Sequence, residues 1–420
     1  MIPAATLPPQ DWLRVEETRA VIAALTSEGG AARFVGGCVR DAVLGRAVRD
    51  IDIATPERPD RVIALLEGAG IRAVPTGIDH GTVTAVIGQA HFEVTTLRLD
   101  VETYGRHARV RYTDDWLIDA SRRDLTINTL YCDLDGQVYD PHGGLADLRA
   151  GRIRFVGEAE TRIREDVLRL LRFFRFRAHY GKGEPDPDGL AACTRLAPLV
   201  EGLSGERVAG EMLRLLEAPD PAAEIARMIA AGVMAPLLPQ AVRVERLRAL
   251  VTIEAGRREI DPLRRLGALI EVGSAAAISA RLVLSNTERA RLAAMTDPGD
   301  VPDPGSDDYA QRVLMYRVGV QAYIDRALLA WAQALSDGPQ ARAADWAAVL
   351  AQAESWTPPA LPVRGRDALA LGLAAGPAVG DALAAVEAWW VENDFQADRD
   401  AALAKLREVV ATLADGVGKG

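Results

Sequence analysis

Residues 34–55 read FVGGCVRDAVLGRAVRDIDIAT, and this stretch decides the fold of the N-terminal part of the chain. Arg33–Val35 is predicted to be a short buried strand, followed at once by two glycines. Cys38–Leu44 then has a helical pattern that Gly45 ends. Asp50–Ala54 alternates polar and apolar side chains, as a half-buried strand does. The stretch therefore predicts a strand, a short helix and a second strand.

Two carboxylates lie on the second of these strands. Asp50 and Asp52 are two residues apart, so their side chains leave the same face. Carboxylates so placed raise each other's pKa unless a cation lies between them. Mg²⁺ suits that position, because it binds one or two carboxylates together with substrate phosphates. The pair predicts metal-assisted attack by a hydroxyl on a triphosphate, although a solvated strand edge would show the same spacing.

The glycine turn adds a second functional signal. A strand that ends in Gly36-Gly37 and opens a helix exposes backbone N–H groups to a phosphate, and Arg40 lies near that helix start. An ordinary strand-to-helix turn would use the same glycines. The spacing is not the G-x-G-x-x-G pattern, so a dinucleotide-binding fold has no support.

The rest of the chain divides into a mixed part and a helical part. Further strands are predicted at Thr82–Ile87 and His91–Leu97, and a helix at Trp12–Leu25, which gives a mixed sheet with flanking helices. From about residue 152 the patterns are helical, at Thr161–Tyr180, Gly205–Glu217 and Pro221–Ala231. Residues 245–415 are rich in Ala and Leu and have no β-branched strand runs. The predicted fold class is α+β, with a small mixed-sheet head followed by helices only.

Composition restricts the surroundings in which the chain works. No apolar run approaches the length of about 18 residues that a membrane span needs, and the N-terminus lacks the features of a secretory signal. Cys38, Cys132 and Cys193 fit neither a disulfide framework nor zinc-ligand spacing, so we expect no zinc and a cytoplasmic location. The net charge is −10, yet Arg149–Tyr180 carries a local surplus of positive charge. No pattern indicates an oligomeric state.

Several motifs then follow one another in a fixed order. They are Gly36-Gly37-x-Val39-Arg40-Asp41, Asp50-Ile51-Asp52-Ile53-Ala54-Thr55, Phe92–Arg98, Arg122-Arg123-Asp124-Leu125-Thr126-Ile127-Asn128, Asp140-Pro141-x-Gly143-Gly144-x-x-Asp147-Leu148, and Glu165-Asp166-Val167-Leu168-Arg169 with its continuation to Phe176. On these motifs the chain resembles the class II tRNA nucleotidyltransferases and bacterial poly(A) polymerases of the polymerase-β-like nucleotidyltransferase superfamily. The resemblance is dense over 34–215, thin over 216–355 and partial near 361–390.

The resemblance implies roles for particular residues. Asp50 and Asp52 would be the catalytic residues and would bind Mg²⁺. The incoming nucleotide would be bound by Gly36, Gly37, Arg40, Arg122, Arg123, Asp124, Asn128, Asp166, Arg169, Arg172 and Arg175. Asp166 and Arg169, three apart on a predicted helix, would read the edge of the base in place of a nucleic-acid template. Glu93 would be a third carboxylate or a partner for an arginine, and it could equally be a surface residue of its strand.

The resemblance also implies a division into domains. Residues 1–148 would form the nucleotidyltransferase head, 149–215 a neck with the base-recognition helix, 216–296 a helical body, and 297–420 a helical tail that contacts tRNA. A loop at Gly105–Trp116 would help the pocket change from CTP to ATP. All five histidines precede residue 181, so we expect no His-Asp phosphohydrolase domain in the helical part.

Three functions remain open on these grounds. The leading expectation is CCA addition, in which CMP, CMP and AMP from CTP and ATP are added to the 3′ end of tRNA and pyrophosphate is released. A poly(A) polymerase, or an enzyme that adds only CC or only A, would carry the same motifs. A non-catalytic RNA-binding protein built on a nucleotidyltransferase head is the alternative from another class.

Overall fold

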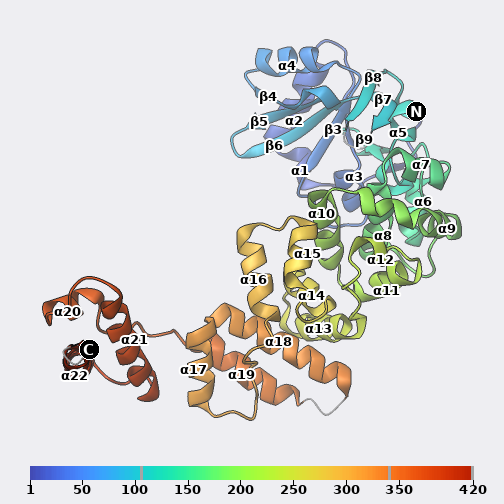
Figure 1. Ribbon diagram of the computed structural model, residues 1–420. Coiled ribbons are helices and arrows are strands. Elements are labelled where there is room, and N and C mark those ends of the chain that lie inside the picture. Colours follow the sequence, from blue (N-terminus) through green and yellow to red (C-terminus); the bar gives the residue numbers. More distant parts are fainter. Residues whose placement is uncertain (105–106, 339–341, 418–420) are drawn as a thin grey trace. The chain divides into compact units, whose positions relative to one another are not determined.

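The computed structural model describes residues 1–104, 107–338 and 342–417, and the chain forms two compact units (Figure 1). Unit 1 comprises Met1–Val244, Arg258–Pro262 and Ala277–Leu284. Unit 2 comprises Glu245–Arg257, Leu263–Ala276 and Ser285–Gly420. Within the described residues, the named strands all belong to unit 1, so the mixed part and the helical part of the sequence are both present as predicted.

Unit 1 is built around one eight-stranded sheet with the strand order β1-β10-β9-β2-β3-β6-β5-β4. The strands are β1 (Ala5–Thr6), β2 (Arg33–Val35), β3 (Ile51–Thr55), β4 (Arg72–Gly77), β5 (Thr82–Ile87), β6 (Ala90–Thr96), β9 (Tyr131–Cys132) and β10 (Gln137–Tyr139). Strands β3 and β6 are parallel, and the other pairs are antiparallel. The α+β fold with a small mixed-sheet head is thereby confirmed.

The predicted carboxylates lie at the N-terminal end of β3, an inner strand of this sheet. Strand β3 begins at Ile51, so Asp52 lies on the strand and Asp50 directly precedes it. Ile53 and Ala54 are buried, which holds the strand in the core. The parallel register places Asp52 opposite Glu93 of β6. Three carboxylates from two neighbouring strands therefore lie at one end of the sheet.

Short helices surround the sheet. They are α1 (Asp11–Arg14), α2 (Glu16–Thr26), α3 (Gly37–Val43), α4 (Pro59–Gly68), α5 (Trp116–Ser121) and α6 (Gly144–Ala150), with 3₁₀ turns η1 (Ile78–His80) and η2 (Thr126–Asn128). Helix α3 packs on β2 and β3, and α4 packs on β4, β5 and β6. The single helix predicted at Trp12–Leu25 is wrong, because Val15 has an extended backbone and separates α1 from α2.

A separate hairpin follows the sheet. Strands β7 (Arg98–Tyr104) and β8 (His107–Tyr112) pair with each other in antiparallel fashion. Residues 107–112 of the loop expected at Gly105–Trp116 are therefore a strand, and their sequence alternates in the way that a strand does, whereas 113–115 are a connection to α5. Gly105 and Arg106 lie outside the described residues. The base of the hairpin is close to the sheet, because a Cβ at Gly81 would lie 2.9 Å from the ring of Tyr112.

A series of helices follows the sheet in unit 1, and the first of them lie in the region 149–215 that was predicted to be the neck. They are α7 (Ala159–Glu165), α8 (Leu168–Tyr180), α9 (Pro187–Leu196), η3 (Ala197–Gly202), α10 (Gly205–Leu216), α11 (Ala222–Ala230) and α12 (Met234–Leu237). The continuous helix predicted at Thr161–Tyr180 is wrong, because it breaks at Asp166, whose backbone is extended (φ −151°, ψ 106°). The Asp166 carboxylate accepts a hydrogen bond from the N–H of Leu168 at 3.2 Å and so begins the next helix.

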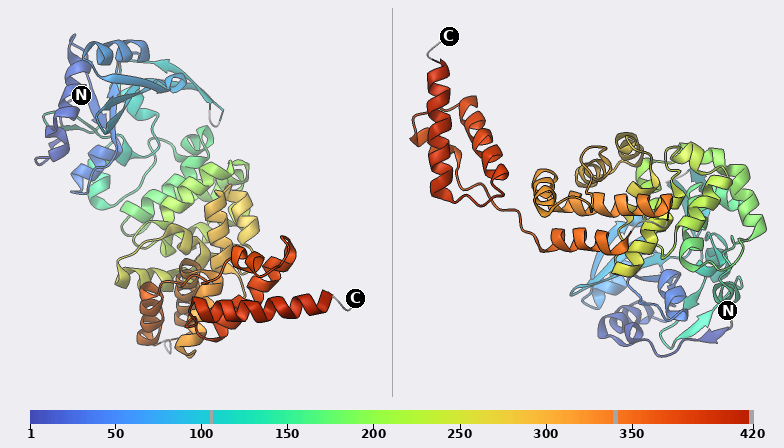
Figure 2. Two further views of the ribbon diagram at one scale, coloured as in Figure 1. Left: turned by 90° about the vertical axis from the view of Figure 1, so that its left-hand side faces the viewer. Right: turned by 90° about the horizontal axis from the view of Figure 1, so that it is seen from below.

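Unit 2 is helical throughout its described residues. Its helices are α13 (Val244–Arg257) and α14 (Pro262–Leu269), each with its first residue in unit 1, and α16 (Asn286–Thr296), α17 (Asp308–Val318), α18 (Val320–Asp337), α19 (Ala343–Ser355), α20 (Gly365–Ala370), α21 (Pro377–Glu392) and α22 (Arg399–Val417). Helix α15 (Ala275–Leu282) crosses the boundary, and its residues from Ala277 onward belong to unit 1. Helices α20, α21 and α22 pack around a small core that includes Val386 and Leu406 (Figure 2). Among the described residues, no helix is long and apolar enough to cross a membrane.

Candidate active site

The carboxylates at the end of the sheet act on one another electrically. Burial raises the pKa of Asp52 to about 6, and the negative charges of Glu93 and Asp50 raise it as well. The guanidinium groups of Arg123 and Arg40 oppose this rise. Neighbouring negative charge therefore contributes to the raised pKa of Asp52, and a bound cation would offset that charge.

This set of oxygen donors fits a magnesium ion. Within the part of the chain that the structure describes, no three His, Cys, Asp or Glu side chains are close enough to form a metal site by themselves. Mg²⁺ rarely uses such a protein-only cage and is instead held by one or two carboxylates plus substrate phosphates. Asp50 and Asp52 can supply those carboxylates, and Glu93 lies in register beside them. Glu93 is exposed on its strand, so a role as third carboxylate stays a prediction.

The glycine turn lies beside two arginines. Gly36 has a φ of +71°, a conformation that favours glycine, and it precedes α3 as predicted. A Cβ at Gly36 would lie 3.7 Å from Nη1 of Arg123, and one at Gly37 would lie 3.8 Å from Nη2 of Arg40. The Gly36 N–H donates to the carbonyl of Leu130 at 3.0 Å, so this amide is already engaged in the sheet.

Arg40 is held inside the unit. Its side chain is buried, and its guanidinium donates to both oxygens of Asp41 and to Oδ1 of Asn128 at 2.8 Å. It also lies over the rings of Phe176, at 5.1 Å, and Tyr180, at 4.4 Å. Arg40 therefore connects α3 with η2 and with α8, and its charge acts on Asp52 from a fixed position.

The two arginines of the Arg-Arg-Asp motif share one partner that the sequence did not single out. Arg122 and Arg123 both donate to the carboxylate of Asp119 on α5. Although burial alone would raise the pKa of Asp119, the positive charges of Arg123 and Arg122 and the hydrogen bond from Tyr131 hold it well below its usual range. The available sequence signal was the spacing of Asp119 three and four residues before the arginines.

The third residue of that motif joins the head to the neck helix. Asp124 accepts from Nε of Arg172 at 2.6 Å and from the amide of Asn128 at 3.0 Å. Burial would raise the pKa of Asp124, but the charge of Arg172 and these hydrogen bonds hold it far below the usual value. The predicted residues Asp124, Asn128, Arg172 and Arg40 thus form one continuous network.

The predicted base-reading pair is not a mutual ion pair. Asp166 accepts from Nη2 of Arg207 at 2.9 and 2.7 Å, and Arg169 contacts Glu165 at 2.5 Å. Arg169 also donates through Nη2 to the backbone carbonyl of Arg122 at 2.9 Å. Arg207 therefore fixes the Asp166 carboxylate, and Glu165 fixes the Arg169 guanidinium. Arg169 also lies next to the Arg-Arg-Asp motif.

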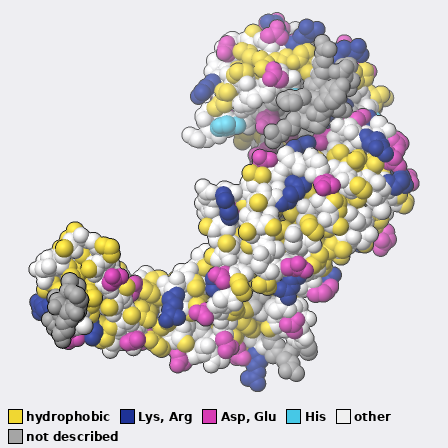
Figure 3. Space-filling model, in the orientation of Figure 1, with side chains coloured by type: hydrophobic (Ala, Val, Ile, Leu, Met, Phe, Trp, Pro, Cys, Tyr) yellow, Lys and Arg dark blue, Asp and Glu magenta, His cyan; other side chains and the backbone are white. Residues whose placement is uncertain are grey.

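The remaining neck arginines are also paired. Arg175 lies 2.6 Å from Oε2 of Glu211 on α10 and 4.3 Å from the ring centroid of Phe176. Every arginine from Arg152 to Arg177 has a carboxylate within 4.0 Å. On the face drawn in Figure 3, Lys and Arg side chains are scattered rather than gathered. The surplus of positive charge between Arg149 and Tyr180 therefore comes mostly from arginines that are paired with carboxylates of the same unit.

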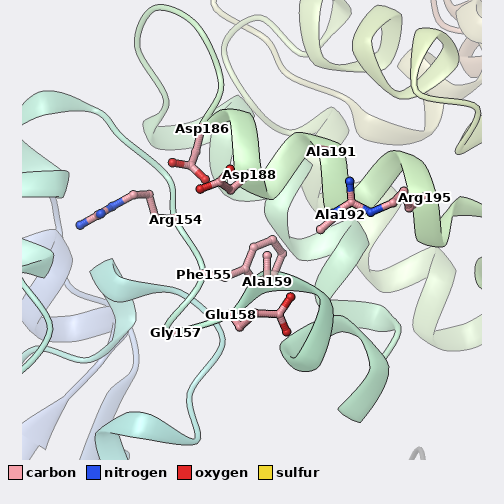
Figure 4. Close-up of a pocket in the computed structure, with 10 residues that line it drawn as sticks. All are labelled: Arg154, Phe155, Gly157, Glu158, Ala159, Asp186, Asp188, Ala191, Ala192 and Arg195. Atoms are coloured by element: carbon pink, nitrogen blue, oxygen red, sulfur yellow. The ribbon is translucent and has the colours of Figure 1, made fainter.

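A cavity of about 530 Å³ lies elsewhere in the neck (Figure 4). It is lined by residues of the α6–α7 connection and of α9, among them Arg154, Glu158, Asp186 and Asp188. None of the predicted site residues lines it. Two of its carboxylates have structural roles, since Glu158 and Asp186 cap α7 and α9. The candidate site is therefore the carboxylate end of the sheet, and this cavity does not belong to it.

Comparison with protein-family models agrees with this position. Residues 32–154 match the model described as "Poly A polymerase head domain". Residues 184–243 match the one described as "Probable RNA and SrmB- binding site of polymerase A". The first match covers the sheet with the carboxylates, and the second covers α9 to α12, so both fall on elements of unit 1.

Individual relatives extend the comparison. The chain is 45% identical to the mitochondrial CCA tRNA nucleotidyltransferase 1 of Homo sapiens over 190 residues, which are 44% of this chain and 43% of that protein. It is 38% identical to the CCA-adding enzyme of Geobacillus stearothermophilus over 235 residues, which are 56% of this chain and 57% of that enzyme. The matched region thus spans about half the length of these curated relatives.

A solved structure covers more of the chain. The Bacillus stearothermophilus CCA-adding enzyme in complex with CTP is 29% identical, with a TM-score of 0.74 over 96% of this chain and 98% of that one. The sheet and the family model identify a nucleotidyltransferase head over residues 32–154, and helices follow it in unit 1. Over residues 32–154 and 184–243 the chain is similar to the class II tRNA nucleotidyltransferases and bacterial poly(A) polymerases.

Proposed function

We propose that the chain is a CCA-adding enzyme that extends the 3′ end of tRNA with CMP, CMP and AMP from CTP and ATP. The observation that carries this proposal is the similarity over 96% of the chain to a CCA-adding enzyme in complex with CTP. The relatives named above carry CCA addition in their names, which supports this reading over poly(A) synthesis. The family model of the head bears the poly(A) name, so poly(A) addition is the second candidate.

The proposed reaction is a displacement at the α-phosphate. The 3′-oxygen of the RNA forms a bond to the α-phosphorus, the bond between the α-phosphorus and its bridging oxygen breaks, and pyrophosphate leaves while the hydroxyl loses its proton. Mg²⁺ bound by Asp50 and Asp52 would lower the pKa of the attacking hydroxyl and neutralise charge on the leaving group. Glu93, in register with Asp52, adds negative charge that strengthens retention of the ion.

The other site residues bind and orient the nucleotide in this proposal. Arg122 and Arg123 grip the triphosphate through their planar donor groups. Asp166 accepts from the exocyclic amino group that cytosine and adenine share, and Arg169 donates to the neighbouring ring acceptor. Arg40, Asp124, Asn128 and Arg172 hold the sheet and the neck helix in register through their network. The last of the site residues is Arg175, whose guanidinium lies over the ring of Phe176.

We also infer a reducing compartment such as the cytoplasm. Cys38, Cys132 and Cys193 are buried and have free thiols. Unpaired buried thiols are typical of reducing surroundings. The tRNA 3′ end is the proposed RNA partner, and α20–α22 are proposed to contribute contacts to it.

The test is nucleotide incorporation by the purified full chain. Transcripts of tRNA that lack the terminal CCA, and an unstructured RNA, are supplied with CTP and ATP singly and together, with Mg²⁺ or with EDTA. We expect C, C and A to be added to tRNA only, and the addition to be lost with EDTA and in Asp52→Ala. Asp60→Ala, which alters an exposed aspartate at the start of α4, is the matched control and retains activity.

Each other outcome selects one of the alternatives. Long A-tails on both RNAs would identify a poly(A) polymerase, and addition of C alone or A alone would identify a partial enzyme. RNA binding without any incorporation by the wild-type protein would contradict the enzyme proposal and leave the non-catalytic RNA-binding reading.

A further inference from the structure

Asp119 occupies an unusual position for a charged residue, and none of the motifs quoted from the sequence includes it. It lies on α5 and is 1% exposed. A buried carboxylate is costly unless it is fully paired, so its partners define its purpose. Nothing in the proposed reaction requires Asp119 to touch a substrate.

The partners of Asp119 divide between its two oxygens. Oδ1 accepts from Nε of Arg122 at 2.9 Å, from Nη2 of Arg122 at 2.7 Å, and from the backbone N–H of Arg98 at 3.3 Å. Oδ2 accepts from Nη2 of Arg123 at 3.1 Å, from Nε of Arg123 at 3.4 Å, and from the hydroxyl of Tyr131 at 2.7 Å. One carboxylate thus holds both arginines, each by the same two nitrogens.

This arrangement fixes the direction in which Arg123 presents its remaining nitrogen. Nε and Nη2 face Asp119, and Nη1 lies on the side of the Gly36 turn, 3.7 Å from where a Cβ would be. The charge of Arg123 also acts on Asp52. The guanidinium therefore points from the buried carboxylate towards the carboxylate end of the sheet, where a triphosphate would lie.

Arg122 is fixed by the same group and is joined to the neck as well. Its Nε and Nη2 face Asp119, and its backbone carbonyl accepts from Nη2 of Arg169. Helix geometry allows this double contact, because residues three and four positions after Asp119 lie on its side of the α5 end. Displacement of Asp119 would therefore disturb both arginines together.

We propose that Asp119 is a positioning residue for nucleotide transfer, which holds Arg122 and Arg123 in the arrangement that binds the triphosphate. The inference rests on the proposed function. The role requires an ionised carboxylate, since two arginine forks need acceptors on both oxygens. An asparagine has the same shape but presents N–H donors to one of the two guanidinium groups, and it leaves two arginines sharing one acceptor.

The experiment compares Asp119→Asn with Asp147→Asn. Asp147 is also 1% exposed, and it also pairs with two arginines, Arg152 and Arg154, and accepts from the hydroxyl of Thr126 at 2.7 Å. It holds no residue of the proposed nucleotide site. The two variants therefore remove the same kind of buried charge, and only the first should affect the triphosphate.

We expect the KM for CTP and for ATP to rise about tenfold or more in Asp119→Asn, the loss that follows from one or two charge-assisted hydrogen bonds. The KM for tRNA should stay within about twofold, because its contacts do not depend on these arginines. In Asp147→Asn all three KM values should stay within about twofold of wild type, whatever the loss of thermal stability. Titration calorimetry of CTP binding to each protein, with Mg²⁺ and without RNA, checks the result: the affinity for CTP should fall in Asp119→Asn and stay near that of wild type in Asp147→Asn.

An unchanged KM for CTP and ATP in Asp119→Asn would overturn the inference, as would an equal rise in Asp147→Asn. If Asp119→Asn does not fold, Asp119→Glu is measured instead. It keeps the charge but moves it by one methylene, so the KM for the triphosphate should still rise, and an unchanged value overturns the inference. If the wild-type chain incorporates no nucleotide, the proposed function fails; if wild type is active and the variants keep its KM, only this inference fails.

Discussion

At the scale of single residues, the site consists of side chains whose positions are set by other side chains. Asp166 would read the base in the proposed reaction, and Arg207 on α10 donates to both of its oxygens. This contact keeps an acceptor available while it limits the rotation of the carboxylate. Glu165 does the same for Arg169. The accuracy of base reading should then depend on residues that never touch the base.

Arg207→Ala should lower the selection of CTP over UTP. Uracil carries a carbonyl where cytosine carries an amino group, and an Asp166 carboxylate that is held only by the N–H of Leu168 excludes it less well. We expect the ratio of kcat/KM values for CTP and UTP to fall about tenfold, measured by single-nucleotide incorporation on tRNA. Arg195→Ala, which breaks an exposed ion pair with Glu160, is the control and should keep the ratio. A wild-type ratio in Arg207→Ala would show that Asp166 needs no holder.

The sequence predicted those site residues that lie in ordered motifs, and it missed those defined by distant partners. The spacing of Asp50 and Asp52 on a strand indicated a carboxylate pair, whereas Arg122 and Arg123 were assigned through the resemblance to a family motif. Glu211 contacts Arg175 from another helix, and nothing in either local pattern indicates that contact. A buried carboxylate is recognised only when its partners are known in space.

At the scale of elements, prediction succeeded where burial alternates along a strand. Strand β5 has the predicted bounds, because Val83 and Ala85 are buried between exposed or half-buried neighbours. Strands β1, β9 and β10 have two or three residues each, and β1 pairs with residues more than 130 positions away. Such short strands carry no period of their own. Their structure comes from the sheet that they join, so the sequence could not predict them.

Helix α10 offers an internal comparison of two glycines. A Cβ at Gly205 would lie 2.3 Å from the carbonyl oxygen of Arg281, whereas one at Gly210 would meet nothing within 4 Å. Gly205→Ala should therefore lower the free energy of unfolding by about 1–3 kcal/mol through overpacking. Gly210→Ala should raise it by about 0.5–1 kcal/mol, because alanine favours the helix. Urea unfolding of both variants checks the prediction, and a loss of stability in both would show that the close contact is not the cause.

At the scale of the whole molecule, each unit contains its own buried ion pairs that join its helices. In unit 2, Glu254 and Asp325 are fully buried, and they bind Arg264, Arg265 and Arg291 from neighbouring helices. These contacts join α13, α14, α16 and α18. Unit 2 is thus held by a buried ionic network in addition to its apolar core.

Asp325→Ala should destabilise unit 2 strongly. It removes the carboxylate that Arg264 and Arg291 share, and breaking a buried pair costs about 3–5 kcal/mol. Glu245→Ala, which removes an exposed pair with Arg248 on α13, should change the free energy of unfolding by less than about 0.5 kcal/mol. Thermal unfolding followed by circular dichroism compares the two. Equal melting temperatures would mean that the network contributes little.

The contacts between the sheet and α8 limit how such proteins can be recombined. Arg40 lies over Tyr180, the Tyr180 hydroxyl donates to Asp41 at 2.9 Å, and Arg172 contacts Asp124. In a chimera of two related proteins joined at residue 148, the two partners of each of these contacts would come from different proteins. Exchange that preserves these contacts must carry residues 40–180 together, so the exchanged segment extends beyond the catalytic head.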